Sequence, residues 1–252
     1  MPFQLTKIIN ELYERDEFEP ILVYGPLGFG KSAYAMKVVA ELYAEDGKLN
    51  WEAVKERVVF HPKDFVKRVL NMEKRDKALI WDDGGLWLHA LDFWNPFVKN
   101  VGKYLNVART DLAALIITTP LPTWVITKVR GLPDAINIKI IKEGGPTTPS
   151  TMPDHPYPRK QRVAKAYKQW ILPDMKKTGV REIFRDHFSA FLPNDFFYDW
   201  YKPLRDKYAT MAKRLMRDSL EKTKDLEAAG YLPGKPEGAE PADDSTPLPI
   251  FP

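Results

Sequence analysis

The most informative stretch of this sequence is Gly25-Pro26-Leu27-Gly28-Phe29-Gly30-Lys31-Ser32, which has the spacing of a phosphate-binding loop. It follows the apolar run from Ile21 to Tyr24 and precedes helix-forming residues, and the motif requires this strand-loop-helix context. Its glycines allow backbone N–H groups to point toward phosphate oxygens, and the start of the next helix adds a positive dipole end. The alternative is a glycine-rich turn that binds no ligand.

The positions of the loop have separate roles in this interpretation. Lys31 would reach the β- and γ-phosphate oxygens of a nucleotide, and the hydroxyl of Ser32 would hold Mg²⁺. We therefore expect ATP and Mg²⁺ as cofactors. The nucleotide-binding residues that the motif predicts are Gly25, Pro26, Leu27, Gly28, Phe29, Gly30, Lys31, Ser32 and Ala33.

A second motif supplies the carboxylates that a nucleotide-bound metal needs. The apolar run from Ala78 to Trp81 ends in Asp82 and Asp83, which places both acids at the carboxyl edge of the predicted sheet, where open α/β sheets bind ligands. Asp82 would hold Mg²⁺ through its water shell, and Asp83 would orient or deprotonate the attacking water. The alternative is an acidic turn, because Asp and Gly favour turns.

The next predicted strand carries hydroxyl groups at its end, where the apolar run finishes in Thr118 and Thr119. A hydroxyl at this strand end would lie near the phosphate loop and the acidic pair, so either threonine could hydrogen-bond the γ-phosphate or the attacking water. The alternative is equally compatible with the sequence, because threonine is common in strands for its shape alone.

Apolar runs and helix-like stretches alternate between residues 20 and 142, which is typical of a parallel sheet with crossover helices. We predict an α/β fold with a five-stranded parallel P-loop NTPase core, helices on both faces and an amphipathic helix that begins near Phe3. The predicted helices lie near residues 31–45, 63–74, 94–108 and 121–130. The predicted strands are Ile21 to Tyr24, Arg57 to Phe60, Ala78 to Trp81, Ala113 to Thr118 and Ala135 to Ile141.

The sequence after the core changes in composition. Residues 143–158 are rich in proline and predict a linker or loop between a core of residues 1–142 and a smaller C-terminal module of residues 159–231. This module begins with nine basic and three acidic residues between positions 159 and 188, and it contains a predicted strand from Arg162 to Ile171 and a helix entered at Pro203. Residues 232–252 are acidic and proline-rich, so we expect a disordered tail.

Composition excludes several classes of protein. The 252 residues contain no cysteine and four scattered histidines, which removes disulfide frameworks and makes a structural zinc site improbable. No apolar run reaches the length of a membrane span and no signal peptide is evident, so we expect a cytoplasmic protein, in the host cytoplasm if the chain is viral. A net charge of +4 and a pI of about 9.0 permit a polyanionic partner.

Residues 18–142 resemble the additional-strand class of P-loop ATPases, and AAA+ ATPases most closely. The resemblance is carried by the order of three motifs along the chain: the phosphate loop, the acidic strand end and the polar strand end. The resemblance implies ATP hydrolysis in a homo-oligomer, with Arg130, or else Arg109, reaching the nucleotide of a neighbouring subunit. A solvated cation at a helix end is the alternative for Arg130. The family usually has Glu where this chain has Asp83, and Asn where it has Thr118 or Thr119, so the match implies slow hydrolysis.

The whole chain also resembles DnaA-like ATPases of crenarchaeal spindle-shaped viruses and plasmids, which implies DNA handling: replication initiation, helicase loading or genome packaging. Tyr167 and Trp170 could then stack on bases, although a solvated charged face with core aromatics explains the same residues. The cations expected to contact DNA phosphates are Arg159, Lys160, Arg162, Lys165, Lys168, Lys176 and Lys177.

Other functions share the same phosphate loop. A small-molecule or nucleotide kinase is the second hypothesis, although no arginine-rich lid is obvious in the core. A GTPase switch is the third, and its guanine-reading N-K-x-D sequence does not occur. In the fourth, ATP stabilises an interaction protein whose ending, Pro247-Leu248-Pro249-Ile250-Phe251-Pro252, docks to a protein partner by a polyproline mode.

Overall fold

The computed structural model describes residues 2–92, 94–132, 135–142, 161–171 and 178–228. The chain divides into two compact units, Met1–Phe197 and Tyr198–Pro252. The predicted linker of residues 143–158 and the predicted tail of residues 232–252 lie outside the described residues.

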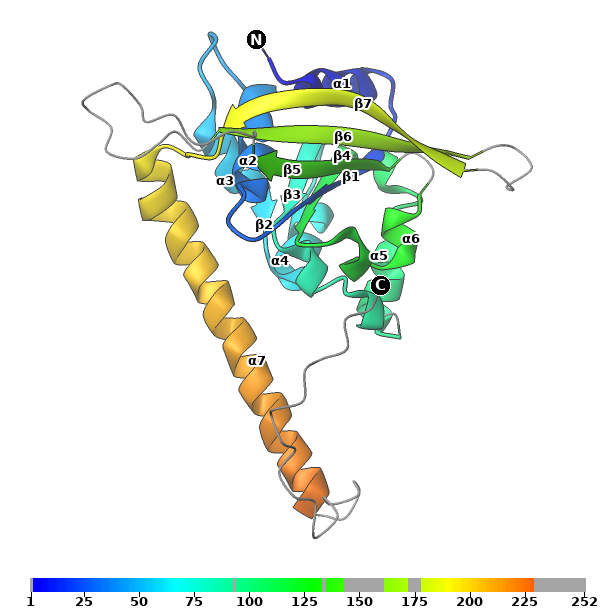
Figure 1. The fold of residues 1–252 in the computed structure, drawn as a ribbon, viewed down its shortest axis with the longest axis vertical. Helices are drawn as coiled ribbons and strands as arrows, with labels where there is room; N and C mark the ends of the chain where they lie inside the picture. The colour runs from blue at the N-terminus through cyan, green and yellow to red at the C-terminus, as the bar shows by residue number, and fades with distance from the viewer. Residues whose placement is uncertain (1, 93, 133–134, 143–160, 172–177, 229–252) are drawn as a thin grey trace, which may run out of the picture. The chain divides into compact units, whose positions relative to one another are not determined.

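One seven-stranded sheet forms the centre of the first unit, with the strand order β2-β3-β4-β1-β5-β6-β7 (Figure 1). The strands β1 to β5 pair in parallel, and each of the five predicted strands corresponds to one of them. The range Arg57 to Phe60 was predicted too long, because Arg57 ends α3 and β2 contains only Val58 and Val59. The strands β6 and β7 pair antiparallel and extend the sheet beyond β5. The bounds are β1 Glu19–Tyr24, β2 Val58–Val59, β3 Asp76–Trp81, β4 Leu112–Thr119, β5 Ile136–Lys142, β6 Gln161–Ile171 and β7 Thr178–Ser189.

The prediction of a five-stranded sheet was therefore wrong in strand number, and the separate basic C-terminal module is not confirmed. The strand predicted from Arg162 to Ile171 is confirmed as β6, but it pairs with β5 over the register from Ile136↔Lys168 to Lys142↔Arg162. Strand β7 was not predicted because charged residues separate its apolar residues, Val180, Ile183, Phe184 and Phe188, which do not follow a regular alternation.

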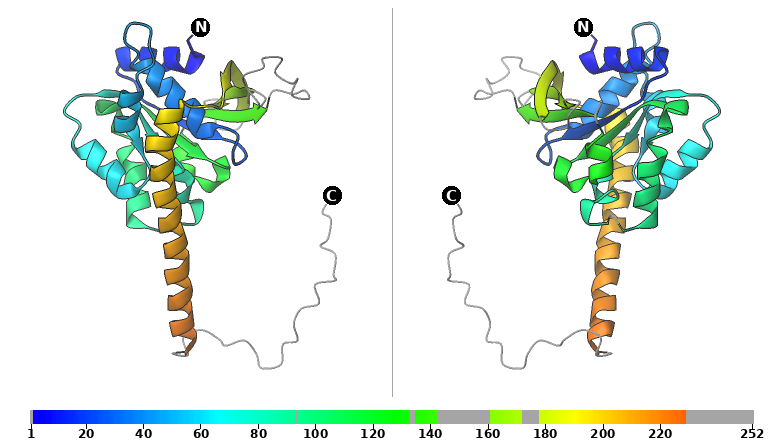
Figure 2. Two further views of the ribbon diagram at one scale, coloured as in Figure 1. Left: turned by 90° about the vertical axis from the view of Figure 1, so that its left-hand side faces the viewer. Right: turned by 90° about the vertical axis from the view of Figure 1, so that its right-hand side faces the viewer.

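Helices cover both faces of the sheet (Figure 2). The predicted helices near 31–45, 63–74 and 94–108 are confirmed with shorter bounds, whereas the stretch 121–130 forms only a 3₁₀ turn and α6. Asn95 shows why α5 begins where it does, because its side chain accepts a hydrogen bond from the N–H of Phe97 at 2.9 Å. The helices of the first unit are α1 Gln4–Glu14, α2 Lys31–Leu42, α3 Trp51–Arg57, α4 Pro62–Leu70, α5 Pro96–Tyr104 and α6 Thr127–Arg130, with 3₁₀ turns η1 Gly84–Leu86, η2 Ala90–Asp92, η3 Ala108–Thr110 and η4 Pro122–Trp124.

The core of the first unit is built on strands that are buried on both faces. Alternate residues of β3, such as Leu79 and Trp81, pack with Val98 and Val101 of α5 in one apolar cluster. Helices α1 and α2 contact the other face of β3 and β4. Ile9 of α1 is fully buried there. Continuous apolar strands of this kind are typical of a parallel sheet covered by helices.

The second unit consists mainly of α7 Lys202–Ala228, which follows the π-helical segment η5 Phe196–Tyr201. The helix predicted to begin at Pro203 is thus confirmed, one residue earlier than expected. In the part of the chain that the structure describes, no helix is both long and apolar enough to cross a membrane.

Candidate nucleotide-binding site

The phosphate loop connects β1 to α2, as the sequence predicts. Gly30 ends the loop in the left-handed conformation, with φ of 90°, and a Cβ atom at this position would lie 2.8 Å from the Cβ of Ala190. Glycine is therefore required here both for the backbone conformation and for the close approach of the segment that follows β7.

Lys31 is buried at the start of α2, and its Nζ donates hydrogen bonds to the carbonyl oxygens of Gly25 and Pro26 at 3.0 and 3.2 Å. The ammonium group thus lies inside the loop that would surround phosphate. Phosphate oxygens can replace these carbonyl contacts, because a charge-assisted hydrogen bond to an anion is stronger than one to a neutral carbonyl.

Three predicted site residues meet at one carboxylate oxygen. Oδ1 of the fully buried Asp82 accepts hydrogen bonds from Ser32 Oγ at 2.6 Å and from Thr118 Oγ1 at 2.7 Å. The residues come from α2, the end of β3 and the end of β4. The strand order explains the meeting, because β4 lies between β1 and β3 and carries Thr118 between the loop and the acids.

The acidic turn after β3 is held against β4. Asp83 has a left-handed backbone with φ of 50°, and its N–H donates a hydrogen bond to Thr118 Oγ1 at 2.8 Å. The hydroxyl of Thr118 donates its one hydrogen bond to Asp82, and the hydroxyl of Thr119 donates to the carbonyl oxygen of Leu121 at 3.0 Å. In this structure both hydroxyls hold the turn and the strand end, and their contact with phosphate or water stays a prediction.

The donor atoms at Asp82 suit Mg²⁺. This ion prefers a few carboxylate or hydroxyl oxygens and completes its shell with water and substrate phosphates. Ser32 and Asp82 supply oxygens of this kind. No group of three or more His, Cys, Asp or Glu side chains that could hold a metal occurs within the described residues, so an all-protein metal cage is not found there.

The two candidate arginines lie away from these groups. Arg130 ends α6, where its Nη2 donates to Thr127 Oγ1 at 3.4 Å and its buried Nε has no hydrogen-bond partner among the described residues. Arg109 lies in η3 before the amino end of β4, opposite the edge that carries Thr119. Both positions are compatible with action on a neighbouring copy, which remains a prediction.

The structure separates the basic residues that the sequence grouped together. Arg162 is only 8% exposed and lies beside the phosphate loop, with its Cζ 5.7 Å from the ring centroid of Phe29. Lys168 forms an ion pair with Glu19. Lys165 is half-buried on the opposite face of β6 from Arg162. Arg159, Lys160, Lys176, Lys177 and the side chain of Trp170 lie outside the described residues.

One buried carboxylate fixes β7 against two helices near the loop. Asp186 accepts hydrogen bonds from the N–H groups of Gln4 and Leu5 at 2.8 and 3.4 Å, and from the hydroxyl of Tyr34 in α2 at 2.7 Å. Burial, and then the charge of Asp186, raise the pKa of Tyr34 well above its ordinary value. Sequence inspection missed Asp186, because its role depends on contacts with residues more than 150 positions away.

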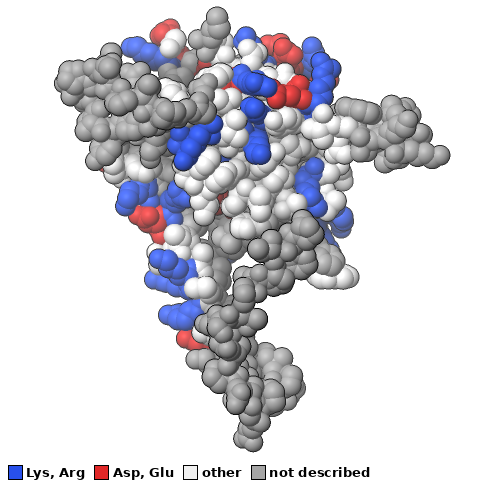
Figure 3. Space-filling model, viewed as in Figure 1, with Lys and Arg blue, Asp and Glu red and all other residues white. Residues whose placement is uncertain are grey.

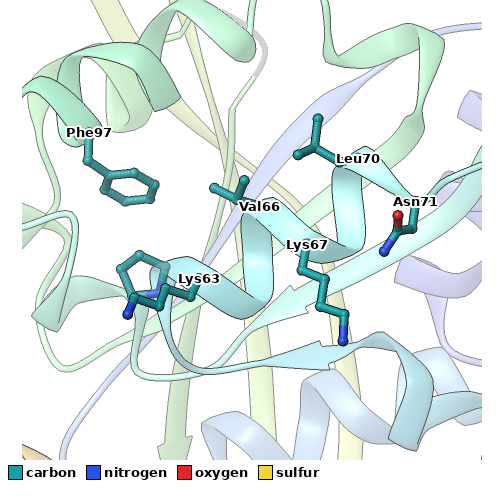
Figure 4. Close-up of a pocket in the computed structure, with 7 residues that line it drawn as sticks. Lys63, Val66, Lys67, Leu70, Asn71 and Phe97 are labelled. Atoms are coloured by element: carbon teal, nitrogen blue, oxygen red, sulfur yellow. The ribbon is translucent and has the colours of Figure 1, made fainter.

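A surface groove lies elsewhere, on α4 and the start of α5 (Figure 4). Val66, Leu70 and Phe97 give it an apolar lining, to which Lys63 and Lys67 add positive charge. No phosphate-loop residue lines it, and it contains no carboxylate or hydroxyl side chain that could serve the chemistry expected at Asp82.

Comparison with known proteins gives two viral relatives in sequence. The chain is 30% identical over 131 residues to protein B-251 of Sulfolobus spindle-shape virus 1, which covers 50% of this chain and 52% of that protein. It is 26% identical over 121 residues to protein ORF286 of Acidianus two-tailed virus, covering 46% and 41% respectively. The chain thus matches about half the length of these relatives or less. No protein-family model matches the sequence.

Among solved structures, the chain is similar to the N-terminal domain of zonular occludens toxin from Neisseria meningitidis, with a TM-score of 0.38 and 13% identity over 71% of this chain and 97% of that one. It is also similar to the genome packaging NTPase B204 from Sulfolobus turreted icosahedral virus 2 in complex with ATP-gammaS. That TM-score is 0.28, with 11% identity over 70% of this chain and 88% of that one.

Proposed function

We propose that this protein is a Mg²⁺-dependent ATPase of the additional-strand, AAA+-like class, which couples ATP hydrolysis to DNA handling as a homo-oligomer. Replication initiation, helicase loading and genome packaging are the processes that such an activity would serve. The observation that carries the proposal is the meeting of Ser32, Asp82 and Thr118 beside a phosphate loop that contains a buried lysine.

Each residue has a defined task in this mechanism. The backbone N–H groups of the loop and the ammonium of Lys31 bind the phosphate chain, and Ser32 and Asp82 hold Mg²⁺, which neutralises charge on the phosphates. Asp83 orients the attacking water and accepts its proton, while Thr118 fixes the acidic turn. Arg130 of a neighbouring copy stabilises the charge that builds on the transferred phosphoryl group.

The DNA half of the proposal is supported by three cations that we call the basic row: Lys139, Lys165 and Arg185. They are in cross-strand register, Lys139↔Lys165 and Lys165↔Arg185, on the face of β5, β6 and β7 opposite to Ile138 and Ile140. Lys and Arg side chains gather over these strands in Figure 3, with acidic side chains beside them. Arg185 forms an ion pair with Glu182 on the same strand, whereas Lys139 and Lys165 lie directly opposite each other across β5 and β6. Like charges in this position destabilise a sheet, so the pair of lysines favours a polyanionic partner that offsets their repulsion.

The test measures ATP turnover with and without DNA, together with DNA affinity. We expect DNA to stimulate the wild-type protein and Lys31→Ala to abolish turnover. Arg130→Ala should keep ATP binding but lose turnover. The double variant Lys165→Glu with Arg185→Glu should keep DNA-free turnover but bind DNA about tenfold more weakly or worse, since each contact to phosphate releases counterions.

Lys7→Glu with Lys103→Glu is the matched control, because it reverses two exposed charges on α1 and α5. It should leave both readouts unchanged. ATP binding without any effect of DNA on turnover would contradict the DNA half and favour a kinase or an ATP-stabilised interaction protein. Full turnover by Lys31→Ala would contradict the assignment of the site.

A further inference from the structure

Arg162 is a buried cation without a matching anion among the described residues. Its Nη1 donates a hydrogen bond to the carbonyl of Gln161 at 2.7 Å, while its Nε is buried and has no hydrogen-bond partner there. Burial of a charged group without a partner is unfavourable, and an unsatisfied polar group in a folded protein calls for an explanation such as a missing ligand.

The location of Arg162 indicates which ligand is missing. Its guanidinium lies over the ring of Phe29, which stands between Gly28 and Gly30 in the phosphate loop. Lys142 is paired with Arg162 in the sheet register, and its Nζ lies 5.1 Å from the centroid of the same ring. Two cations, one from β5 next to β1 and one from β6 beside β5, therefore flank the phosphate loop at the edge of the sheet where Asp82 lies.

The orientation of β6 separates Arg162 from the basic row. Residues of a strand alternate between its two faces, so Arg162, Ala164 and Ala166 share the face of Ile138 and Ile140, whereas Lys165 lies on the other face with Lys139. Arg162 is thus poorly placed for the DNA contact that the sequence suggested, and it is well placed for a ligand of the loop.

We propose that Arg162 is a nucleotide-binding residue that pairs with the phosphate chain of ATP in the same subunit. This inference rests on the proposed function, because it takes the loop to bind ATP. The planar guanidinium can form two parallel hydrogen bonds with phosphate oxygens, and the ring of Phe29 holds its plane by cation–π contact. Strand β6 then carries a nucleotide contact at Arg162 and a DNA contact at Lys165 on opposite faces.

The test combines calorimetric titration with MgATP and thermal unfolding with and without MgATP. Arg162→Gln should weaken ATP binding about ten- to a hundredfold, the range expected for loss of a hydrogen bond to a charged group. Without nucleotide, its unfolding temperature should equal or exceed that of the wild type, because the variant removes an unpaired buried charge. The rise in unfolding temperature on adding MgATP should shrink accordingly.

Two further variants keep the outcome interpretable. Arg162→Lys retains the charge but loses the planar fork, so it should recover part of the ATP affinity. Arg181→Gln removes an exposed arginine from β7 in the same hairpin and should leave ATP affinity unchanged. If Arg162→Gln binds MgATP like the wild type, or if it unfolds at a lower temperature than the wild type in the absence of nucleotide, Arg162 is structural and the inference is overturned.

These outcomes differ from failure of the proposed function. If the wild-type protein itself does not bind MgATP, the proposed function falls and this inference falls with it. If the wild type binds MgATP and Lys31→Ala does not, the proposed function stands, and the Arg162 variants alone decide the inference.

Discussion

At the scale of single residues, Oδ1 of Asp82 accepts hydrogen bonds from two hydroxyl groups, those of Ser32 and Thr118. Ser32 belongs to the side of the site that binds phosphate, whereas Thr118 also accepts the N–H of Asp83. The position of the acid proposed to orient water thus depends on a hydroxyl group that need not touch the nucleotide.

Thr118→Val tests this dependence. It deletes the hydroxyl at nearly constant volume and leaves the N–H of Asp83 without its acceptor, so we expect ATP turnover to fall about tenfold or more while ATP affinity stays within about threefold. The free energy of unfolding should fall by about 1–3 kcal/mol, the cost of an unsatisfied buried group. Steady-state kinetics, MgATP titration and urea unfolding measure the three effects.

Thr118→Ser restores the hydroxyl and should recover turnover. Thr110→Val, at an exposed hydroxyl bonded to Val107, is the matched control. A Thr118→Val protein with wild-type turnover would show that the acidic turn holds its position without this hydroxyl.

At the scale of elements, the turn from β3 into η1 is packed closely against the end of β4. A Cβ atom at Gly85 would lie 2.3 Å from Thr119 Oγ1, so Gly85→Ala must displace the turn or the threonine. Overpacking of this kind should lower the free energy of unfolding by about 1–3 kcal/mol in urea unfolding. Adding Thr119→Ala, which removes the clashing oxygen, should recover most of that loss.

Gly102→Ala provides a control of opposite sign. Gly102 lies inside α5, where the nearest atom to an added Cβ is Lys128 Cδ at 3.4 Å. This change should stabilise the protein by about 0.5–1 kcal/mol, because alanine loses less conformational entropy in a helix than glycine. An equal effect of both alanine substitutions would contradict the steric explanation for Gly85.

The elements also show which parts of the structure can be predicted from sequence. Strand β1 with its loop, the acidic end of β3 and the polar end of β4 were predictable, because each has a local pattern with a local physical cause. The contact of Arg162 with Phe29 was not predictable, because it requires β6 to return beside β5. Nothing in residues 143–160 indicates that pairing, and the composition of this stretch suggested a boundary between modules instead.

At the scale of the whole molecule, one buried and two half-buried tyrosines donate hydrogen bonds to carboxylates in three separate regions. Tyr34 contacts Asp186, Tyr43 contacts Asp76 and Tyr104 contacts Asp111. In each case burial, and then the nearby carboxylate, raises the tyrosine pKa, which reaches about 12 for Tyr43. The folded protein therefore keeps these hydroxyls protonated at pH values where the unfolded chain ionises them.

The sign of the resulting pH dependence follows from this difference. Below about pH 10 both states hold the protons, so the contribution to stability is fully present there. Between pH 10 and the raised pKa values the folded state binds more protons, so the free energy of unfolding falls by up to about 1.4 kcal/mol per pH unit for each tyrosine. Urea unfolding at pH 8, 9, 10 and 11 measures this fall.

Tyr104→Phe should reduce the fall of the free energy of unfolding with pH above pH 10 by the contribution of about one proton, because it removes one of the three tyrosine hydroxyls. An unchanged slope in this variant, or a wild-type stability that is constant from pH 9 to pH 11, would contradict the assignment.

The carboxylate of Asp186 has a consequence for the order in which the molecule can assemble. It contacts the N–H of Gln4, 182 positions earlier in the chain, and the hydroxyl of Tyr34 beside the phosphate loop. When residues 1–142 have left the ribosome during synthesis, Lys31, Asp82 and Thr118 are already present. Asp186, the partner of both the start of α1 and Tyr34, has not yet been made available. The first helix and the phosphate loop therefore reach their final environment only after β7 has left the ribosome.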